Sequence, residues 1–246
     1  MARGSGPVVA VIPARYASTR LPGKHLLAET GKPLIQHVYE RVRGCAGLDR
    51  ILVATDDDRI LQAVKSFGGE AVMTSNRHPT STDRIAEAVR NLDCATVLHL
   101  KGDQPEIEPE TIETLIGLLD GAEMATLAVP FLDLQESLPA NHVKVVVDRH
   151  HNALYFSRAR IPYANGTATP ALRQLQIYGY TKAFLQRFVT LDPTPLELAE
   201  KLEPLRALEH GYKIKIGIVK VKSRGGIETA EDYAAFVKRM RERVPS

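Results

Sequence analysis

The sequence predicts an α/β protein with an open, mostly parallel sheet flanked by helices and a smaller mixed β insertion. Two observations carry this prediction. From Val8 onward, short apolar runs alternate with segments whose apolar residues recur at helical spacing, a pattern typical of parallel βαβ units. After Pro130 the strand-like runs follow one another without helices between them, which favours mixed or antiparallel pairing.

The first half of the chain alternates strands and helices. The run Val8–Ile12 is apolar throughout, as expected for a strand buried on both faces. Further along, Leu34, Ile35 and Val38 fall on one side of a helix. The expected strands cover residues 8–12, 51–54, 71–73, 96–100 and 124–129, and the expected helices cover residues 33–42, 57–67, 82–92 and 109–119.

The second half is less regular. Its strand-like runs lie at residues 144–148, 153–156 and 176–180. A long helix is expected at residues 195–210, an alternating strand at 213–221 and a closing helix at 229–243. Residues 1–7 are expected to be an irregular N-terminal segment, which we exclude from the fold.

Composition and charge exclude several classes of protein. Of the 246 residues, 25% are charged and 44% hydrophobic, unlike disordered or collagen-like chains. The net charge of +3 does not call for nucleic acid or a membrane as partner. Cys45 and Cys94 lie far apart without a CxxC pattern, which argues against a zinc cluster or a disulfide framework. No apolar run approaches the ~20 residues that span a bilayer, so we expect a cytoplasmic protein.

Two common phosphate-binding signatures are absent from the sequence. Gly4 and Gly6 precede the first strand instead of following it, so there is no dinucleotide fingerprint. Gly23 and Lys24 are followed by His25, and no glycine stands five residues before Gly23, so there is no Walker loop. Dinucleotide-dependent enzymes and P-loop ATPases are therefore disfavoured.

A cationic loop follows the first strand instead. Residues 13–24 contain Arg15, Arg20 and Lys24, with hydroxyls at Ser18 and Thr19. In an open α/β sheet the ligand binds beyond the carboxyl ends of the strands, and guanidinium and ammonium groups suit a triphosphate. The alternative is a solvated basic loop without a ligand. We expect Lys24 to be exposed, and we expect His25 to be the histidine closest to a ligand.

A carboxylate stands at a second strand end. Asp103 follows the strand at residues 96–100, and Mg²⁺ binds through one or two carboxylates plus phosphate oxygens. A Gly-Asp pair in an ordinary turn is the alternative. A cationic loop and a strand-end carboxylate at one edge of a sheet together favour a metal-assisted triphosphate site.

The stretch Val11–Lys24, which reads VIPARYASTRLPGK, resembles the opening of the 3-deoxy-manno-octulosonate cytidylyltransferases, the CMP-Kdo synthetases. The resemblance extends from about Val8 to the final helix. Further matching blocks occur in order at residues 51–56, 124–130, 143–146, 153–159, 177–180 and 195–197.

The resemblance implies a Rossmann-like sheet of the nucleotidyltransferase type. It implies transfer of CMP from CTP to the anomeric hydroxyl of 3-deoxy-manno-octulosonate (Kdo), with Mg²⁺ as cofactor and pyrophosphate as product, for lipopolysaccharide biosynthesis. CTP and an acidic sugar are the expected partners, and a homodimer is the expected assembly. We expect a single domain over residues 1–246, with a nucleotide-binding part at about 8–123, a sugar-binding and dimerisation part at about 124–212, and a C-terminal strand and helix at 213–246.

The resemblance also implies roles for individual residues. For Arg84, the alternative to the nucleotide-binding role given below is a surface charge at a helix start. For Tyr178, the alternative to the sugar-binding role is an ordinary core tyrosine. The implied catalytic residues are Arg15, Lys24 and Asp103, and the implied metal ligands are Asp103 and Glu228. The implied nucleotide-binding residues are Ala14, Arg15, Ser18, Arg20, Lys24, Thr82, Arg84 and Lys101, and the implied sugar-binding residues are Arg158, Gln174, Tyr178 and Glu203.

The chain departs from the family pattern at several positions. Lys101 stands where the family has Gln, and Glu228 where it has Asp. Gln174 and Gln176 lie in a block that usually reads Arg-His-x-Gly, and Pro204 replaces a Gln. These changes suggest an intact nucleotide half and an altered sugar half. The alternatives to a Kdo enzyme are a cytidylyltransferase for another acidic acceptor, such as an amino-ulosonate or a phosphonate, and a nucleotide-binding protein without turnover.

Overall fold

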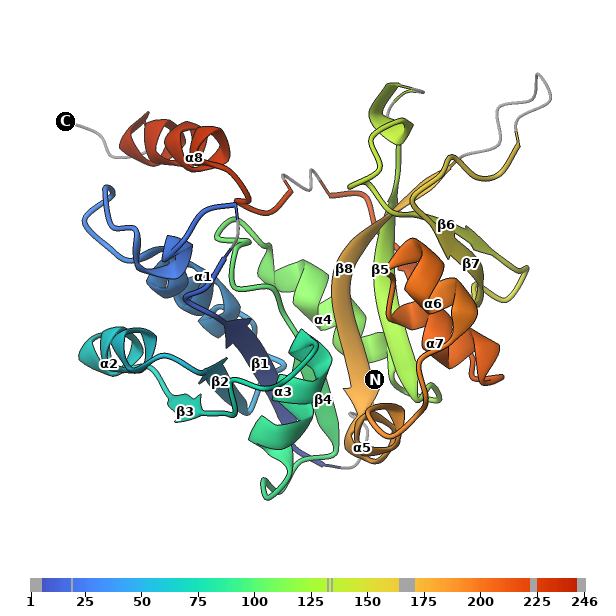
Figure 1. Cartoon of the computed structure of the whole chain (residues 1–246), viewed down its shortest axis with the longest axis horizontal. Helices are drawn as coiled ribbons and strands as arrows, with labels where there is room; N and C mark the ends of the chain where they lie inside the picture. Colours follow the sequence, from blue (N-terminus) through green and yellow to red (C-terminus); the bar gives the residue numbers. More distant parts are fainter. Residues whose placement is uncertain are drawn as a thin grey trace. The chain divides into compact units, whose positions relative to one another are not determined.

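The computed structural model describes residues 6–18, 20–131, 133, 135–163, 171–221 and 225–242. The chain divides into two compact units (Figure 1). We call residues 7–113 and 224–246 the N-terminal unit, and residues 1–6 and 114–223 the central unit. The boundary falls within helix α4 (Pro109–Leu118). The single domain expected from the sequence stays a prediction.

The N-terminal unit is a parallel sheet with helices packed on it. Strand β1 pairs in parallel with β2 and with β4, and β2 pairs in parallel with β3. Helices α1, α2 and α3 contact these strands. The elements of this unit are β1 (Val8–Ala14), η1 (Lys24–Leu26), α1 (Leu34–Arg43), β2 (Arg50–Thr55), α2 (Asp58–Ser66), β3 (Ala71–Met73), α3 (Ser81–Val89), β4 (Thr96–His99) and α8 (Ala230–Glu242).

Local sequence explains where these elements begin and how they pack. The inner strand β1 consists almost entirely of buried apolar residues, as a strand covered on both faces requires. Asp57 caps α2 by accepting from the backbone N–H of Arg59, and Thr80 and Asp83 form a capping box on α3. Phe236 of α8 packs in a core cluster with Leu34 of α1, so the C-terminal helix returns to the first part of the chain (Figure 1).

The central unit is mixed, as the sequence predicts. Strand β5 pairs in antiparallel fashion with β8 and in parallel with β9, and β6 pairs in antiparallel fashion with β7 and β8. The elements are β5 (Met124–Pro130), η2 (Gln135–Ser137), β6 (Lys144–Val147), β7 (Ala153–Ser157), β8 (Leu172–Thr181), α5 (Lys182–Phe188), α6 (Pro195–Glu200), α7 (Pro204–Glu209) and β9 (Lys215–Ile218). An α/β fold with an open, mostly parallel sheet flanked by helices is thereby confirmed.

The single helix expected at residues 195–210 is wrong. Helix α6 ends at Glu200, and its C-cap residue Lys201 has a left-handed backbone with φ 52°. Helix α7 begins at Pro204, the first helical position, where the missing N–H of proline costs no hydrogen bond. Glu203 is therefore the N-cap of α7, not a residue inside a helix.

Strand β8 is longer than expected and contains an irregularity. Its pairing with β5 shifts register between Thr126 and Ala128, opposite Gln176. Gln176 has φ 55°, a left-handed conformation that glycine adopts without steric cost. The family pattern has Gly at this position. In the described part of the chain no helix is long and apolar enough to cross a membrane.

Candidate active site

The cationic loop leaves the carboxyl end of β1 and closes on itself. The Tyr16 carbonyl accepts from the backbone N–H of Ser18 at 2.8 Å and from that of Gly23 at 2.9 Å. Gly23 has φ 67°, and a Cβ there would lie 3.0 Å from the Tyr16 ring. The position thus needs glycine for both conformation and space. Thr19 of this loop lies outside the described residues.

An arginine from α2 covers the Tyr16 ring. The guanidinium carbon of Arg59 lies 3.4 Å from the ring centroid, within the range of a cation–π contact. Two nitrogens of Arg59 donate to the two oxygens of Asp57 at 2.9 and 2.7 Å, and Asp57 also caps α2. Arg59 therefore holds Tyr16 of the loop against the start of α2.

Lys24 and Asp103 form a buried ion pair. The Lys24 ammonium donates to Asp103 Oδ2 at 2.6 Å and to the Ile227 carbonyl at 3.0 Å. The expectation that Lys24 is exposed is wrong, because only 9% of the residue is accessible. Burial alone would raise the pKa of Asp103, but the charges of Lys101 and Lys24 outweigh burial and hold that pKa below its ordinary value. Asp103 therefore stays ionised.

Lys101 stands near both implied metal ligands. Its ammonium lies 3.9 Å from Asp103 Oδ1 and 4.0 Å from Glu228 Oε1. Glu228 Oε2 accepts from Arg20 at 2.5 Å. The segment that carries Glu228 is fixed to the strand-end turn, because the backbone N–H of Ile227 donates to the Asp103 carbonyl at 2.8 Å.

His25 connects the cationic loop to the strand-end turn. Its Nδ1 lies 3.1 Å from the Arg15 carbonyl. A carbonyl can only accept, so Nδ1 carries the proton. A Cβ on Gly102 would come within 2.9 Å of His25 Nε2, so the ring lies directly against the turn. Burial and the neighbouring Lys24 lower the pKa of His25 to about 4, and the imidazole is neutral at physiological pH.

Two further residues of the site are buried. Arg84 of α3 is 1% exposed and donates to Asp56 at 2.8 Å and to Thr74 at 2.5 Å. The alternative of a surface charge at the helix start is therefore wrong. His99 ends β4, and burial together with Lys101 lowers its pKa to about 3.

These side chains surround one pocket of about 430 Å³, formed entirely by the N-terminal unit. Its volume falls in the range of small-molecule sites. Ala14 at the end of β1 and Thr82 in α3 are buried but do not line it. The lining includes eight predicted site residues, Arg15, Ser18, Arg20, Lys24, Arg84, Lys101, Asp103 and Glu228, and adds Pro13, Ala17, His25, Ser81, His99 and Gly102.

Two carboxylates of the pocket, those of Asp103 and Glu228, could hold a metal ion. Among the described residues, no group of three or more His, Cys, Asp or Glu side chains gathers. Asp103 Oδ1 is buried without a hydrogen-bond partner in the described part of the chain, and a Cβ on Gly226 would come within 2.8 Å of it. This buried carboxylate oxygen belongs to a side chain that lines the pocket together with Glu228, an arrangement that fits Mg²⁺ completed by phosphate oxygens.

The predicted sugar-binding residues belong to the central unit. Gln174 Nε2 donates to Thr126 Oγ1 at 3.4 Å. Burial raises the pKa of the Tyr178 hydroxyl well above its ordinary value, an effect opposed by Gln174 and Arg158 and increased by Glu203. Gln174, Arg158 and Glu203 therefore all lie near enough to Tyr178 to act on its hydroxyl.

Arg158 has a structural role in that unit. Its guanidinium donates to the backbone carbonyls of Glu200 at 2.7 Å, Ala140 at 3.1 Å and Lys201 at 3.3 Å. These bonds join β7 to the end of α6. Its implied contact with a sugar acid stays a prediction.

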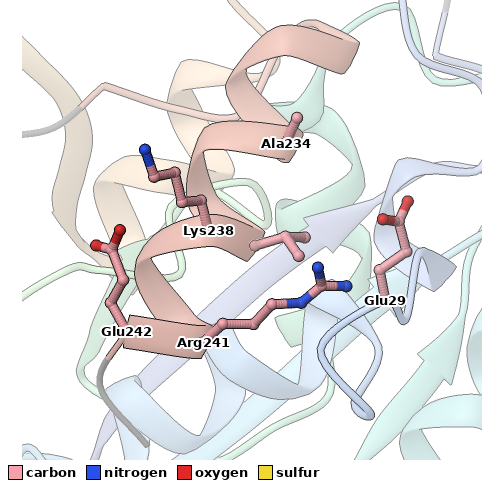
Figure 2. A pocket seen from close by; sticks show the side chains of 6 residues that line it. Glu29, Ala234, Lys238, Arg241 and Glu242 are labelled. Carbon is pink, nitrogen blue, oxygen red and sulfur yellow. The ribbon is translucent and has the colours of Figure 1, made fainter.

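A second hollow of about 440 Å³ lies along α8. Figure 2 shows Lys238, Arg241 and Glu242 on the helix, with Arg241 extending towards Glu29. Charges of both signs border it, and it contains no residue that the sequence singled out.

The comparisons with known proteins agree with this geometry. A family model described as "Cytidylyltransferase" matches residues 9–216. The 8-amino-3,8-dideoxy-manno-octulosonate cytidylyltransferase of Shewanella pealeana is 51% identical over 219 residues, covering 86% of this chain and 89% of the relative. The 3-deoxy-manno-octulosonate cytidylyltransferase of Syntrophobacter fumaroxidans is 48% identical over 239 residues, covering 94% and 95%.

A solved structure shares both fold and sequence. A CMP:2-keto-3-deoxy-manno-octonic acid synthetase complexed with CTP superposes with a TM-score of 0.92 at 40% identity, covering 97% of this chain and all of that one. The chain therefore belongs to the cytidylyltransferase family, within the group that contains the 3-deoxy-manno-octulosonate enzymes, and is a nucleotidyltransferase.

Proposed function

We propose that this enzyme transfers CMP from CTP to the anomeric hydroxyl of an eight-carbon 3-deoxy sugar acid and releases pyrophosphate. The observation that carries the proposal is the pocket of the N-terminal unit, where Arg15, Arg20, Lys24 and Lys101 gather around the carboxylates of Asp103 and Glu228. Cations surround the place where phosphates would lie, and no nucleophile is needed for direct transfer.

The pocket residues act by position and charge. The oxygen of the sugar attacks the α-phosphorus, the bond from that phosphorus to pyrophosphate breaks, and the hydroxyl proton is released. Arg15 is exposed at the pocket and is free to bind phosphate oxygens as a fork. Lys24, fixed by Asp103, supplies a charge that needs little reorganisation during the reaction.

Asp103 and Glu228 are the residues that would hold Mg²⁺. When bound, the metal would neutralise phosphate charge and make the sugar hydroxyl easier to deprotonate. Arg84 is held by Asp56 and Thr74, so it presents a fixed edge of the pocket to the nucleotide.

For the acceptor we propose 8-amino-3,8-dideoxy-manno-octulosonate. This name belongs to the Shewanella pealeana relative and to a second relative, from Shewanella frigidimarina, that is 50% identical over 233 residues. The amine of this sugar is a cation, for which the Glu203 carboxylate near Tyr178 is a suitable partner. Kdo is the second candidate, supported by the Syntrophobacter relative and by the CTP-bound synthetase.

Pyrophosphate release measured with CTP and each sugar acid would test both the proposed reaction and the proposed acceptor. We expect turnover with the two acceptors and a kcat/KM at least ~10-fold higher for the amino sugar, because a site that pairs a polar group discriminates strongly against an analogue lacking it. A preference for Kdo would reverse the acceptor assignment, and no pyrophosphate with either sugar would reject the reaction. Arg15→Ala, at an exposed position, is the matched loss-of-activity control.

The homodimer and the cytoplasmic location stay predictions. Light scattering on the purified chain would test the homodimer by measuring the molecular mass in solution.

A further inference from the structure

Lys101 lies between the two carboxylates that could hold a metal ion. One oxygen of each carboxylate is already bonded, Asp103 Oδ2 to Lys24 at 2.6 Å and Glu228 Oε2 to Arg20 at 2.5 Å. The remaining oxygens, Asp103 Oδ1 and Glu228 Oε1, lie 3.9 and 4.0 Å from the same Lys101 ammonium. Both oxygens left over for a metal thus face one positive charge.

A divalent cation would need the same two oxygens. Because like charges repel strongly in a partly buried site, an ammonium and a metal ion cannot both occupy the space between these carboxylates. We infer that the Lys101 ammonium competes with the divalent cation for Asp103 and Glu228, so that the enzyme binds metal weakly until the nucleotide is present. The inference rests on the metal assignment of the proposed function.

The charge balance of the cluster supports the competition. Lys24, Arg20 and Lys101 carry three positive charges, against two negative charges on Asp103 and Glu228. A metal ion added to this set makes the excess larger. A triphosphate reverses the balance, because its oxygens are acceptors for the cations around it.

Lys101 is able to change partners. Its side chain is 22% exposed, and lysine carries its charge on a flexible four-carbon stem. In the presence of CTP the ammonium can bind phosphate oxygens and release Asp103 Oδ1 and Glu228 Oε1. Metal and nucleotide then bind with positive coupling. A neutral amide at position 101, as in the family pattern, would not compete in this way.

Mn²⁺ binding to the full chain without nucleotide, followed by electron paramagnetic resonance, tests the inference. Lys101→Gln and Lys101→Met remove the charge, and we expect each to bind Mn²⁺ at least ~10-fold more tightly than the wild type, which corresponds to about 1.4 kcal/mol. Lys101→Arg keeps the charge and should bind within ~2-fold of the wild type. With CTP present, the difference between wild type and Lys101→Gln should shrink. Equal Mn²⁺ affinity of wild type and both neutral variants, or equal tightening in the Arg variant, would overturn the competition.

A double variant tests the metal assignment on which this inference rests. Glu228→Gln, combined with Lys101→Gln, should lose the tight Mn²⁺ binding gained by the single variant. If the double variant still binds Mn²⁺ tightly, the metal lies elsewhere and the inference fails. Pyrophosphate release is measured separately, so a chain with the expected Mn²⁺ behaviour and no CMP transfer would reject the proposed reaction and leave the competition standing.

Discussion

Two buried histidines of the pocket should contribute about 4 kcal/mol of destabilisation when the pH falls from 7.5 to 5.0. His25 and His99 are both buried. Burial and Lys24 lower the pKa of His25 to about 4, and burial and Lys101 lower that of His99 to about 3. Both imidazoles are therefore neutral in the folded chain at pH 5.0, whereas in the unfolded chain, with a pKa near 6.5, both take up a proton.

The sign follows from this difference in proton uptake. Between pH 6.5 and the folded pKa values the unfolded state binds more protons, so stability rises with pH and is lost as pH falls. A pH of 5.0 is about 1.5 units below the pKa of each imidazole in the unfolded chain. Proton uptake by the unfolded chain therefore favours unfolding by about 2 kcal/mol per histidine. Carboxylates with lowered pKa values, such as Asp103, begin to lose their contribution only near about pH 5, at the lower end of this interval.

Urea unfolding at the two pH values measures the effect. His99→Gln should reduce the pH dependence of the unfolding free energy by about 2 kcal/mol, and His25→Asn, which keeps a donor near the Arg15 carbonyl, should do the same. His150 is exposed, so His150→Asn is the matched control for replacing a histidine outside the pocket. A double variant of His25 and His99 that retains the full wild-type pH dependence would refute the reasoning.

The remaining predictions concern the cationic loop, the buried ion pair and the bulge. Lys24→Ala should lower turnover by ~100-fold or more and stability by about 3 kcal/mol or more, since Asp103 is left buried without its partner; steady-state kinetics and urea unfolding measure the two effects. Asp103→Asn should lower the melting temperature in calorimetry, because Lys24 is then the unpaired charge. Arg59→Leu should raise KM for CTP by ~2–5-fold with a smaller change in kcat, because an exposed cation–π contact worth about 0.5–1 kcal/mol no longer holds the loop. Gln176→Gly should stabilise the folded chain by about 1 kcal/mol in urea unfolding, by relieving a left-handed backbone.

Clear outcomes would contradict each of these. Full activity of Lys24→Ala would make that side chain purely structural, and a raised melting temperature of Asp103→Asn would mean that burial outweighs the ion pair. Arg50→Leu is the control for Arg59→Leu, because Arg50 is an exposed arginine that pairs with Glu70. If both variants had the same KM for CTP, the cation–π contact would have no role in nucleotide binding. A less stable Gln176→Gly would show that the glutamine side chain contributes more than the backbone costs.

The sequence predicted the N-terminal unit well because its signals are local. Each strand is an apolar run and each helix has an apolar stripe, and the carboxyl ends of parallel strands meet at one edge. The strand order along the chain therefore sufficed to place Arg15, after β1, near Asp103, after β4. The split of the expected helix at 195–210 also had a local signal, Pro204, which begins helices more readily than it continues them.

Long-range contacts could not be predicted in the same way. Lys24 is buried because the C-terminal segment returns over it. The carbonyl of Ile227, 203 residues away in the sequence, accepts a hydrogen bond from the Lys24 ammonium. The approach of Lys101 to Glu228 has the same origin. No periodicity or spacing encodes which loop a returning segment will cover, so burial and pairing at this point emerge only from the folded chain.

Most departures from the family pattern have an explanation in charge or backbone conformation, and one, Gln174, does not. Lys101 and Glu228 are complementary, because a longer carboxylate stands opposite an added ammonium at 4.0 Å, next to the place proposed for the phosphates rather than the sugar. Pro204 begins a helix. Gln176 occupies a left-handed bulge position, where the family's glycine is explained by backbone conformation alone. None of these three features requires a different acceptor. The argument for acceptor selectivity therefore depends on Gln174 and on the groups that influence Tyr178, and those are the positions at which a change of sugar preference should first be sought.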